Sequence, residues 1–144
     1  MIKGPLAQLG SSGQTSDKQP SVLIVDDDQD QVDVLVHRLE TQGFQTFSAD
    51  CGRHGLLLAR NSMPSLILLD LRLPDISGFD ICVELAEDPV TTSIPVIILS
   101  GMERPDIIRR SREAGCEYYV RKPYDPNALL ILIRQAIQES RKWL

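Results

Sequence analysis

Residues 65–78 read SLILLDLRLPDISG, and the rest of the chain is interpreted outward from this stretch. Four apolar residues, 66–69, run into a single acid, Asp70, and then into a loop that contains Pro74 and Gly78. A short apolar run between turn residues is typical of a strand buried on both faces of a parallel sheet, although a buried helix can give the same pattern. Asp70 is therefore expected where this strand leaves the sheet.

Each of three other apolar runs also ends in a polar side chain. These runs and the side chains after them are 22–25 with Asp26 and Asp27, 96–99 with Ser100, and 118–121 with Lys122. In an open parallel sheet all strands finish at the same edge, and ligand sites form in the crevice outside it. The polar groups are therefore expected to converge on one place.

Five strand patterns alternate with five amphipathic patterns along the chain. The expected strands are 22–25, 44–49, 66–69, 96–99 and 118–121, and the expected helices are 29–42, 53–61, 79–87, 105–114 and 126–142. This alternation predicts an α/β fold, a doubly wound five-stranded parallel sheet with helices on both faces. The order 2-1-3-4-5 of flavodoxin-like folds has its site between strands 1 and 3, and would bring Asp26 and Asp27 beside Asp70.

Composition narrows the class of protein. The 144 residues, 42% hydrophobic and 24% charged, suit one globular domain, and no apolar run approaches the ~20 residues of a membrane span. A net charge of -5 argues against direct binding to nucleic acid. Three cysteines without a CxxC pair suit a reducing cytoplasm.

The two ends of the chain suggest a simple domain plan. Residues 1–20 are rich in Gly, Ser, Gln and Pro, so we expect a flexible leader or a cloning remnant there, and a single domain over 21–144. Because the chain stops with its last expected helix, we expect either no output domain or one that was removed.

Clustered carboxylates repel one another, and a divalent cation removes that cost. Oxygen-only ligands suit Mg²⁺. The alternative is that these acids only cap helices, which fits Asp28, since Asp28 and Gln31 resemble a capping box. Capping leaves Asp26 and Asp27 unexplained, so we interpret that pair as metal ligands.

Asp70 alone could be a turn residue. Its place beside a metal-binding pair makes it a candidate nucleophile for phosphoryl transfer, because carboxylates can form acyl phosphates. Lys122 can place a charge on a phosphate oxygen, and Ser100 can donate its hydroxyl to another. Taken singly, Lys122 could be a surface lysine and Ser100 a strand-end hydroxyl, but the combination favours a phosphoaspartate site.

Together these residues resemble the response-regulator receiver domain of two-component signalling, as in chemotaxis regulators. The family has an acidic pair after the first strand, an Asp after the third, a Ser or Thr after the fourth and Lys-Pro after the fifth. The matching residues here are Asp26 and Asp27, Asp70, Ser100, and Lys122 with Pro123. The loop LDLRLPDISG is also similar, and the resemblance covers about residues 21–144.

The resemblance implies a role for each residue of the site. Asp70 would accept a phosphoryl group, by autocatalytic phosphorylation followed by self-dephosphorylation rather than classical enzyme turnover. The metal ligands would be Asp27 directly, Asp26 mainly through water, Asp70, and the backbone carbonyl of Arg72. Ser100 and Tyr119 would be the switch pair, with Tyr118 competing for the second role, and the Lys122–Pro123 bond would be cis.

The resemblance also implies partners. The phosphoryl donor would be a sensor histidine kinase or a phosphotransfer protein. A homodimer or an output partner would bind through the fourth helix, the fifth strand and the fifth helix, where Ile131 and Leu132 lie off the core stripe of the last helix. The protein would be cytoplasmic, with no membrane and no nucleic acid bound directly.

Three other functions can be compared with the same residues. A haloacid-dehalogenase-like phosphatase would carry a second Asp two residues after the first, where this chain has Arg72. A flavodoxin-like electron carrier needs Ser, Thr and Gly after the first strand, where Asp26 and Asp27 would repel the flavin phosphate. A degenerate receiver that only binds partners is disfavoured by the complete residue set.

Overall fold

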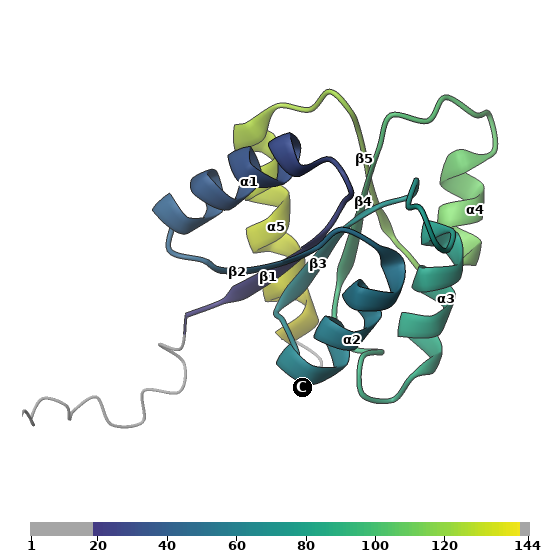
Figure 1. Ribbon diagram of the computed structural model, residues 1–144, viewed down its shortest axis with the longest axis horizontal. Coiled ribbons are helices and arrows are strands. Elements are labelled where there is room, and N and C mark those ends of the chain that lie inside the picture. Colours follow the sequence, from purple (N-terminus) through teal and green to yellow (C-terminus); the bar gives the residue numbers. More distant parts are fainter. Residues whose placement is uncertain (1–18, 142–144) are drawn as a thin grey trace, which may run out of the picture.

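The computed structural model describes residues 19–141, which form a five-stranded sheet with helices on both faces (Figure 1). The strands are β1 (Ser21–Val25), β2 (Gln45–Ala49), β3 (Leu66–Asp70), β4 (Val96–Ser100) and β5 (Tyr118–Arg121). The helices are α1 (Gln29–Thr41), α2 (Gly52–Ser62), α3 (Gly78–Glu87), α4 (Ile107–Glu113) and α5 (Pro126–Arg141). All neighbouring strands pair in parallel in the order β2-β1-β3-β4-β5, which confirms the predicted fold.

Alternate residues of the central strands pack into two separate hydrophobic cores, one on each face of the sheet. Leu66 and Leu68 of β3 pack with α1 and α5, whereas Ile67 and Leu69 pack with α2, α3 and α4. Figure 1 shows the same division, with α1 and α5 on one side of the sheet and α2, α3 and α4 on the other. A strand buried on both faces needs apolar residues at every position, which explains the unbroken run 66–69.

The structure corrects the predicted start of the fourth helix. The sequence predicts a helix over 105–114 with Pro105 in its first turn, but α4 begins at Ile107. The Ile107 N–H donates to the Arg104 carbonyl at 3.2 Å and closes a turn across Pro105 and Asp106. Pro105 therefore belongs to that turn, which also suits its fixed φ.

Two predictions concern residues near the ends of the chain, where the structure describes only part of the sequence. The last helix was expected to reach residue 142, and its described part ends at Arg141. Residues 1–18, most of the expected leader, and 142–144 lie outside the described residues. Among the helices that the structure describes, none combines the length and apolar character needed to cross a bilayer.

Candidate functional site

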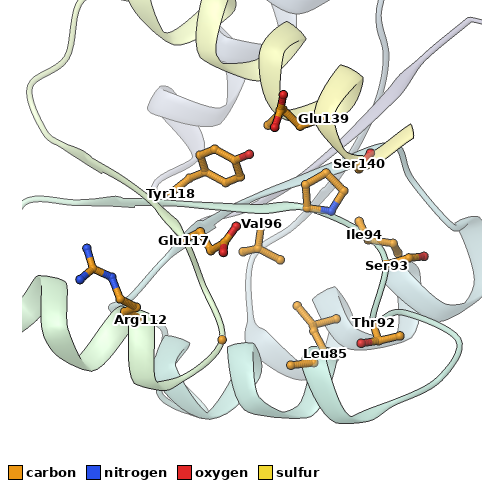
Figure 2. A pocket seen from close by; sticks show the side chains of 14 residues that line it. Leu85, Thr92, Ser93, Ile94, Val96, Arg112, Glu117, Tyr118, Glu139 and Ser140 are labelled. Carbon is orange, nitrogen blue, oxygen red and sulfur yellow. The ribbon is translucent and has the colours of Figure 1, made fainter. Parts of the chain in front are cut away.

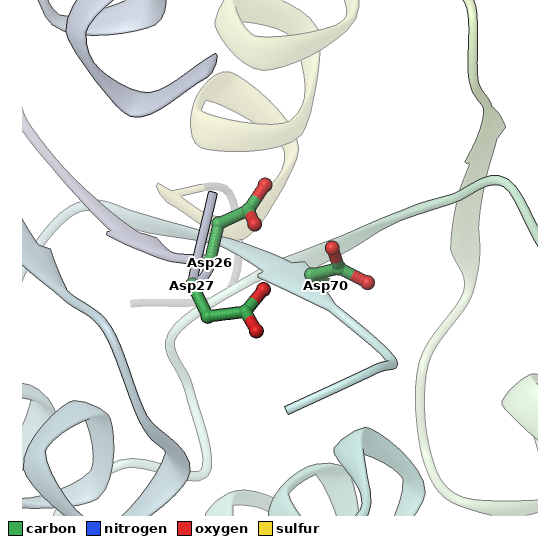
Figure 3. A group of neighbouring side chains, drawn as sticks. All are labelled: Asp26, Asp27 and Asp70. Carbon is green, nitrogen blue, oxygen red and sulfur yellow. The ribbon is translucent and has the colours of Figure 1, made fainter. Parts of the chain in front are cut away.

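The acidic groups meet because β1 and β3 are neighbours in the sheet. Val25, the last residue of β1, pairs with Leu69, so Asp26 and Asp70 leave adjacent strands at the same level. Asp27 follows directly, and carboxylate oxygens of all three residues lie within 4.8 Å of one another. Figure 3 shows the three side chains together at the carboxyl edge of the sheet, as the sequence predicts.

Lys122 bridges two of these carboxylates from the end of β5. Its Nζ donates to Asp26 Oδ2 at 3.0 Å and to Asp70 Oδ2 at 3.2 Å. The second oxygen of each acid accepts a backbone N–H two residues further on, from Asp28 and Arg72 respectively, at 2.9 Å in both cases. Each loop thus holds its own carboxylate through a local turn, while Lys122 joins the two loops.

Burial controls the electrostatics of the site. Asp26 is only 4% exposed, and the Asp70 and Lys122 side chains are 14% and 17% exposed. Burial raises the pKa of Asp70, and the opposing effects of the Arg72 N–H and the Lys122 charge do not fully offset it. For Lys122, burial lowers the pKa, but the hydrogen bond from Lys122 to Asp26 and the charges of Asp70 and Asp26 outweigh it, so its pKa is raised. Lys122 therefore stays cationic at neutral pH.

The donor set fits a divalent cation. Three carboxyl groups lie beside a single ammonium, and every side-chain ligand is a hard oxygen. Within residues 19–141, the exposed Asp27 carboxylate makes no hydrogen bond or ion pair and so has both oxygens free for a metal ion. Asp28 has the other expected role, because its carboxylate caps α1 by accepting the Gln31 N–H at 3.3 Å. The Arg72 carbonyl as a ligand stays a prediction.

Ser100 lies deep at the end of β4. It is 0% exposed, and its Oγ accepts the Met102 N–H at 3.0 Å. Its carbonyl accepts the Lys122 N–H at 2.9 Å, which ties the β4 and β5 ends together beside the acids. The Lys122–Pro123 peptide bond is cis, in agreement with the expectation from the sequence.

The two candidate switch tyrosines face opposite sides of the sheet. Tyr119 packs with the α2, α3 and α4 core, next to Met102, and its hydroxyl donates to the Met102 carbonyl at 3.5 Å. Tyr118 packs on the α1 and α5 side. Only Tyr119 therefore shares a core with the loop that follows Ser100, which favours it for the switch role.

Two residues shape the loop after Asp70, and sequence reasoning found the first, Gly78, but missed the second, Asp75. A Cβ on Gly78 would lie 2.6 Å from the Leu71 Cα and 2.9 Å from the Asp70 carbonyl oxygen, so only glycine permits this close approach. Asp75 accepts the Gly52 and Arg53 N–H groups at 2.7 and 2.9 Å, and so caps α2 from a distant loop. Pro74 and Gly78 mark the turn in the sequence, but no local pattern links Asp75 to α2.

Concave regions occur near both ends of the sheet in the described part of the chain. A groove of about 720 Å³ between α1 and the β5–α5 loop borders the acidic site, and its wall includes Val34, Lys122 and Tyr124. A pocket of about 390 Å³ lies at the amino-terminal ends of β4 and β5, with Tyr118 and Val96 in its wall (Figure 2). The second pocket is therefore separate from the carboxylates at the carboxyl ends of the strands.

Comparison with known proteins agrees with this geometry. Residues 22–134 match the response regulator receiver domain family. The chain is 35% identical over 103 residues to the polar-differentiation response regulator DivK of Brucella ovis, which covers 72% of this chain and 84% of DivK. It is 33% identical over 121 residues to the DNA-binding dual master transcriptional regulator RpaA of Synechocystis sp., covering 84% of this chain but only 50% of RpaA. The chain thus spans half the length of RpaA.

Solved structures show the same architecture. A CheY-like response regulator receiver domain protein from Methanospirillum hungatei JF-1 superposes with a TM-score of 0.83 at 28% identity, covering 88% of this chain and all of that one. The signal receiver domain of a histidine kinase from Syntrophus aciditrophicus gives 0.78 at 30% identity, covering 83% of this chain and 91% of that one. Both solved structures are receiver domains with the sheet architecture of this chain. The chain belongs to the response regulator receiver domain family, a family of signalling proteins rather than classical enzymes.

Proposed function

We propose that Asp70 accepts a phosphoryl group from a phosphohistidine and that this modification switches the affinity of the domain for a partner. The observation that carries the proposal is the Lys122 ammonium, held 3.2 Å from Asp70 Oδ2 and anchored on the buried Asp26. A fixed cation beside a nucleophilic carboxylate is what a transferred phosphoryl group needs, because that transfer depends on positioning and neutralised charge.

Asp70, Arg72 and Lys122 have separate roles in the proposed phosphoryl transfer. The new P–O bond forms at the Asp70 carboxylate while the P–N bond to the donor histidine breaks, and the Arg72 N–H holds the carboxylate in place at 2.9 Å. Lys122 can donate a hydrogen bond to an oxygen of the transferred phosphoryl group, because its Nζ already contacts Asp70. In self-dephosphorylation, water attacks the phosphorus of the acyl phosphate, the P–O bond to Asp70 breaks, inorganic phosphate leaves and the Asp70 carboxylate is restored. The domain supplies both steps itself, without a separate catalytic chain.

We propose that Asp26, Asp27 and Asp70, with the Arg72 carbonyl, hold Mg²⁺. When bound, this ion neutralises negative charge on the carboxylates and the phosphoryl oxygens. The carboxylate oxygens within 4.8 Å of one another support this assignment.

The groove beside the site suits a protein donor. It runs along α1 to the β5–α5 loop and offers the apolar Val34 beside Lys122. Val34 is 58% exposed, so its apolar surface is free for contact in the described structure. We propose that a sensor histidine kinase or phosphotransfer protein presents its phosphohistidine along this groove.

We propose that phosphorylation of Asp70 changes the conformations of Ser100 and Tyr119. In the described structure the Ser100 hydroxyl accepts a hydrogen bond from the Met102 N–H. On phosphorylation this hydroxyl would turn toward the phosphoryl group, and the hydrogen bond to Met102 would break. Tyr119, which contacts the Met102 carbonyl, would then move inward and alter the surface of α4, β5 and α5. We further propose that the receiver domain covers residues 21–144 and acts in the cytoplasm, where its three cysteines stay reduced.

Phosphorylation by a small acyl phosphate with Mg²⁺ tests the assignment. Intact-mass measurement should show the gain of one phosphoryl group on the parent chain, and none on Asp70→Asn or in the presence of a chelator. Asp80→Asn is the control, because Asp80 is an exposed acid on α3 outside the carboxylate cluster and should leave labelling in place. Full labelling of Asp70→Asn at another residue would contradict the proposal.

Val34→Asp tests the donor groove separately. Labelling by the small acyl phosphate should be unchanged, because Val34 lies on α1 and is not a member of the carboxylate cluster. Transfer from a phosphotransfer protein that labels the parent chain should fall at least about tenfold, since a charge replaces buried apolar contact. Equal transfer to both chains would place the donor elsewhere.

A further inference from the structure

Two buried thiols face each other between α3 and the segment that joins α4 to β5. Cys82 lies on α3 and is 2% exposed, and Cys116 lies before β5 and is 5% exposed. The Cys116 thiol donates to the Cys82 sulfur at 2.7 Å, across 34 residues of sequence. A disulfide bond is about 2.05 Å long, so the sulfurs need to approach by only about 0.6 Å to bond.

The backbone holds Cys116 to the end of α4. The Gly115 and Cys116 N–H groups donate to the Arg112 and Ser111 carbonyls at 3.0 and 2.9 Å, a glycine-terminated helix end. Gly115 has a φ of +98°, and a Cβ there would lie 3.1 Å from the Ala86 Cβ of α3. The end of α4 is thus packed closely on α3, and a bond at Cys116 restrains α4 itself.

The surroundings favour reaction within the pair over reaction with another molecule. Both sulfurs are too deeply buried for a bulky thiol to reach. Small molecules can come near, because the pocket in Figure 2 includes Leu85, one turn after Cys82, and Gly115, next to Cys116. Cys51, the third cysteine, lies before α2 and is partly exposed, so it is the natural internal reference for thiol reactivity.

We propose that Cys82 and Cys116 are a redox-sensitive dithiol that a hydroperoxide converts into an intramolecular disulfide tethering α4 to α3. One sulfur attacks the peroxide oxygen, the O–O bond breaks, and a sulfenic acid and an alcohol or water form. The second sulfur then attacks the sulfenic sulfur and water leaves. Two thiols are oxidised by two electrons and one peroxide is reduced, and a dithiol reductant reverses the change.

The tether would act on the segment that the proposed switch uses. The loop closed by Cys82 and Cys116 contains β4, Ser100 and α4, and the pair belongs to the same core as Tyr119. This consequence rests on the proposed function, whereas formation of the bond does not. The hydrogen-bonded Cys116 thiol and burial both raise the pKa of Cys82, so the pair is a slow sensor that stays reduced unless the oxidant persists.

The test is to treat the parent chain and Asp70→Asn with hydrogen peroxide, denature them and alkylate the remaining thiols. We expect a product lighter by two hydrogen atoms that carries one alkyl group, on Cys51, instead of three. Dithiothreitol should restore all three sites. The oxidised chain should unfold at a temperature roughly 10 °C higher, because a loop of this length is closed in the unfolded state.

Two variants complete the test. Cys51→Ser should still lose two hydrogen atoms, and Cys116→Ser should not. Three alkylated cysteines after oxidation, sulfinic acids in place of the disulfide, or a bond that needs Cys51 would each overturn the proposal. Asp70→Asn should form the same bond as the parent chain, so failure of the phosphoacceptor proposal would leave this result intact. A weaker beryllofluoride response of the oxidised parent chain, measured by hydrogen exchange in α4, would support the link to signalling, and an equal response would refute that link.

Discussion

The buried position of Asp70, which the proposed phosphoryl transfer uses, lowers the stability of the folded protein when its carboxylate is ionised. Its carboxylate is mostly buried, and burial raises its pKa above the ordinary value of 3.8 despite the Arg72 N–H and the nearby Lys122 charge. The folded protein therefore holds the Asp70 proton more tightly than the unfolded chain does. The stability of the folded protein falls as the pH rises from about 3.8 through the raised pKa, and the loss is complete once the pH lies above that raised pKa.

Asp70→Asn should consequently raise the unfolding temperature in the presence of a chelator at neutral pH. The amide keeps an acceptor for the Arg72 N–H but removes the buried charge. The gain should shrink as the pH falls below 3.8, where both states of the parent chain are protonated at this residue. Thermal unfolding followed by circular dichroism across this pH range measures it. A variant less stable than the parent at neutral pH would show that the Lys122 ion pair outweighs burial.

The start of α2 depends on a side chain from the β3–α3 loop. Cys51 precedes the helix without a capping hydrogen bond of its own, and Asp75 accepts the Gly52 and Arg53 N–H groups instead. The hydrogen bonds from Arg53 and then Gly52 lower the pKa of Asp75 to about 2. This cap also fixes the loop that begins at Asp70, so it connects helix stability with the site.

Asp75→Asn should lower the unfolding temperature, because the amide loses one of the two acceptors and the charge at a helix N-terminus. For a lowered pKa the contribution is fully present above 3.8 and is lost as the pH falls to about 2. The difference between variant and parent should therefore be largest near neutral pH and disappear near pH 2 in thermal unfolding. Glu84→Gln, at an exposed acid of α3 beyond its first turn, is the control and should show little change.

The end of α2 is strained at Met63. This residue has a φ of +46° and a left-handed conformation that side chains other than glycine adopt at a cost, and its side chain is 56% exposed. Met63→Gly should raise the free energy of unfolding by roughly 1 kcal/mol, as chemical denaturation can measure. Met63→Ala keeps the Cβ and should give no such gain, so equal effects of the two changes would point to the side chain rather than the backbone.

The face formed by α4, β5 and α5 is where the intact domain is expected to meet a partner. Ile131 is 67% exposed and lies opposite the buried stripe of α5, whereas Leu132 is half-buried on its flank. A single exposed isoleucine is ordinary, so the association itself has to be measured.

Sedimentation of the unmodified and beryllofluoride-treated chain tests a homodimer on this face. We expect the treated chain to dimerise and Ile131→Asp to weaken the dimer by about tenfold or more, since it buries a charge. A monomer under every condition would exclude the homodimer and leave only a different partner for this surface.

Local patterns were enough to predict the alternation of strands and helices, and together with the strand order of flavodoxin-like folds they predicted that Asp26, Asp27 and Asp70 meet. The reason is that burial on both faces, as in 66–69, is visible within one strand, and parallel strands end at one edge. The bridge from Lys122 to Asp26 and Asp70 spans 96 and 52 residues of sequence, so only the packed sheet decides its geometry.

The tertiary structure also decided what no single element encodes. The helix α4 starts at Ile107 rather than at the predicted Pro105, because a turn closed by the Arg104 carbonyl takes the place of the first helical residues. Tyr118 and Tyr119 alternate in any strand, but which of them shares a core with Met102 depends on the helices that cover each face. The Asp75 cap on α2 and the Cys82–Cys116 contact join segments that are distant along the chain, and their geometry follows from helix packing on the sheet rather than from any periodicity.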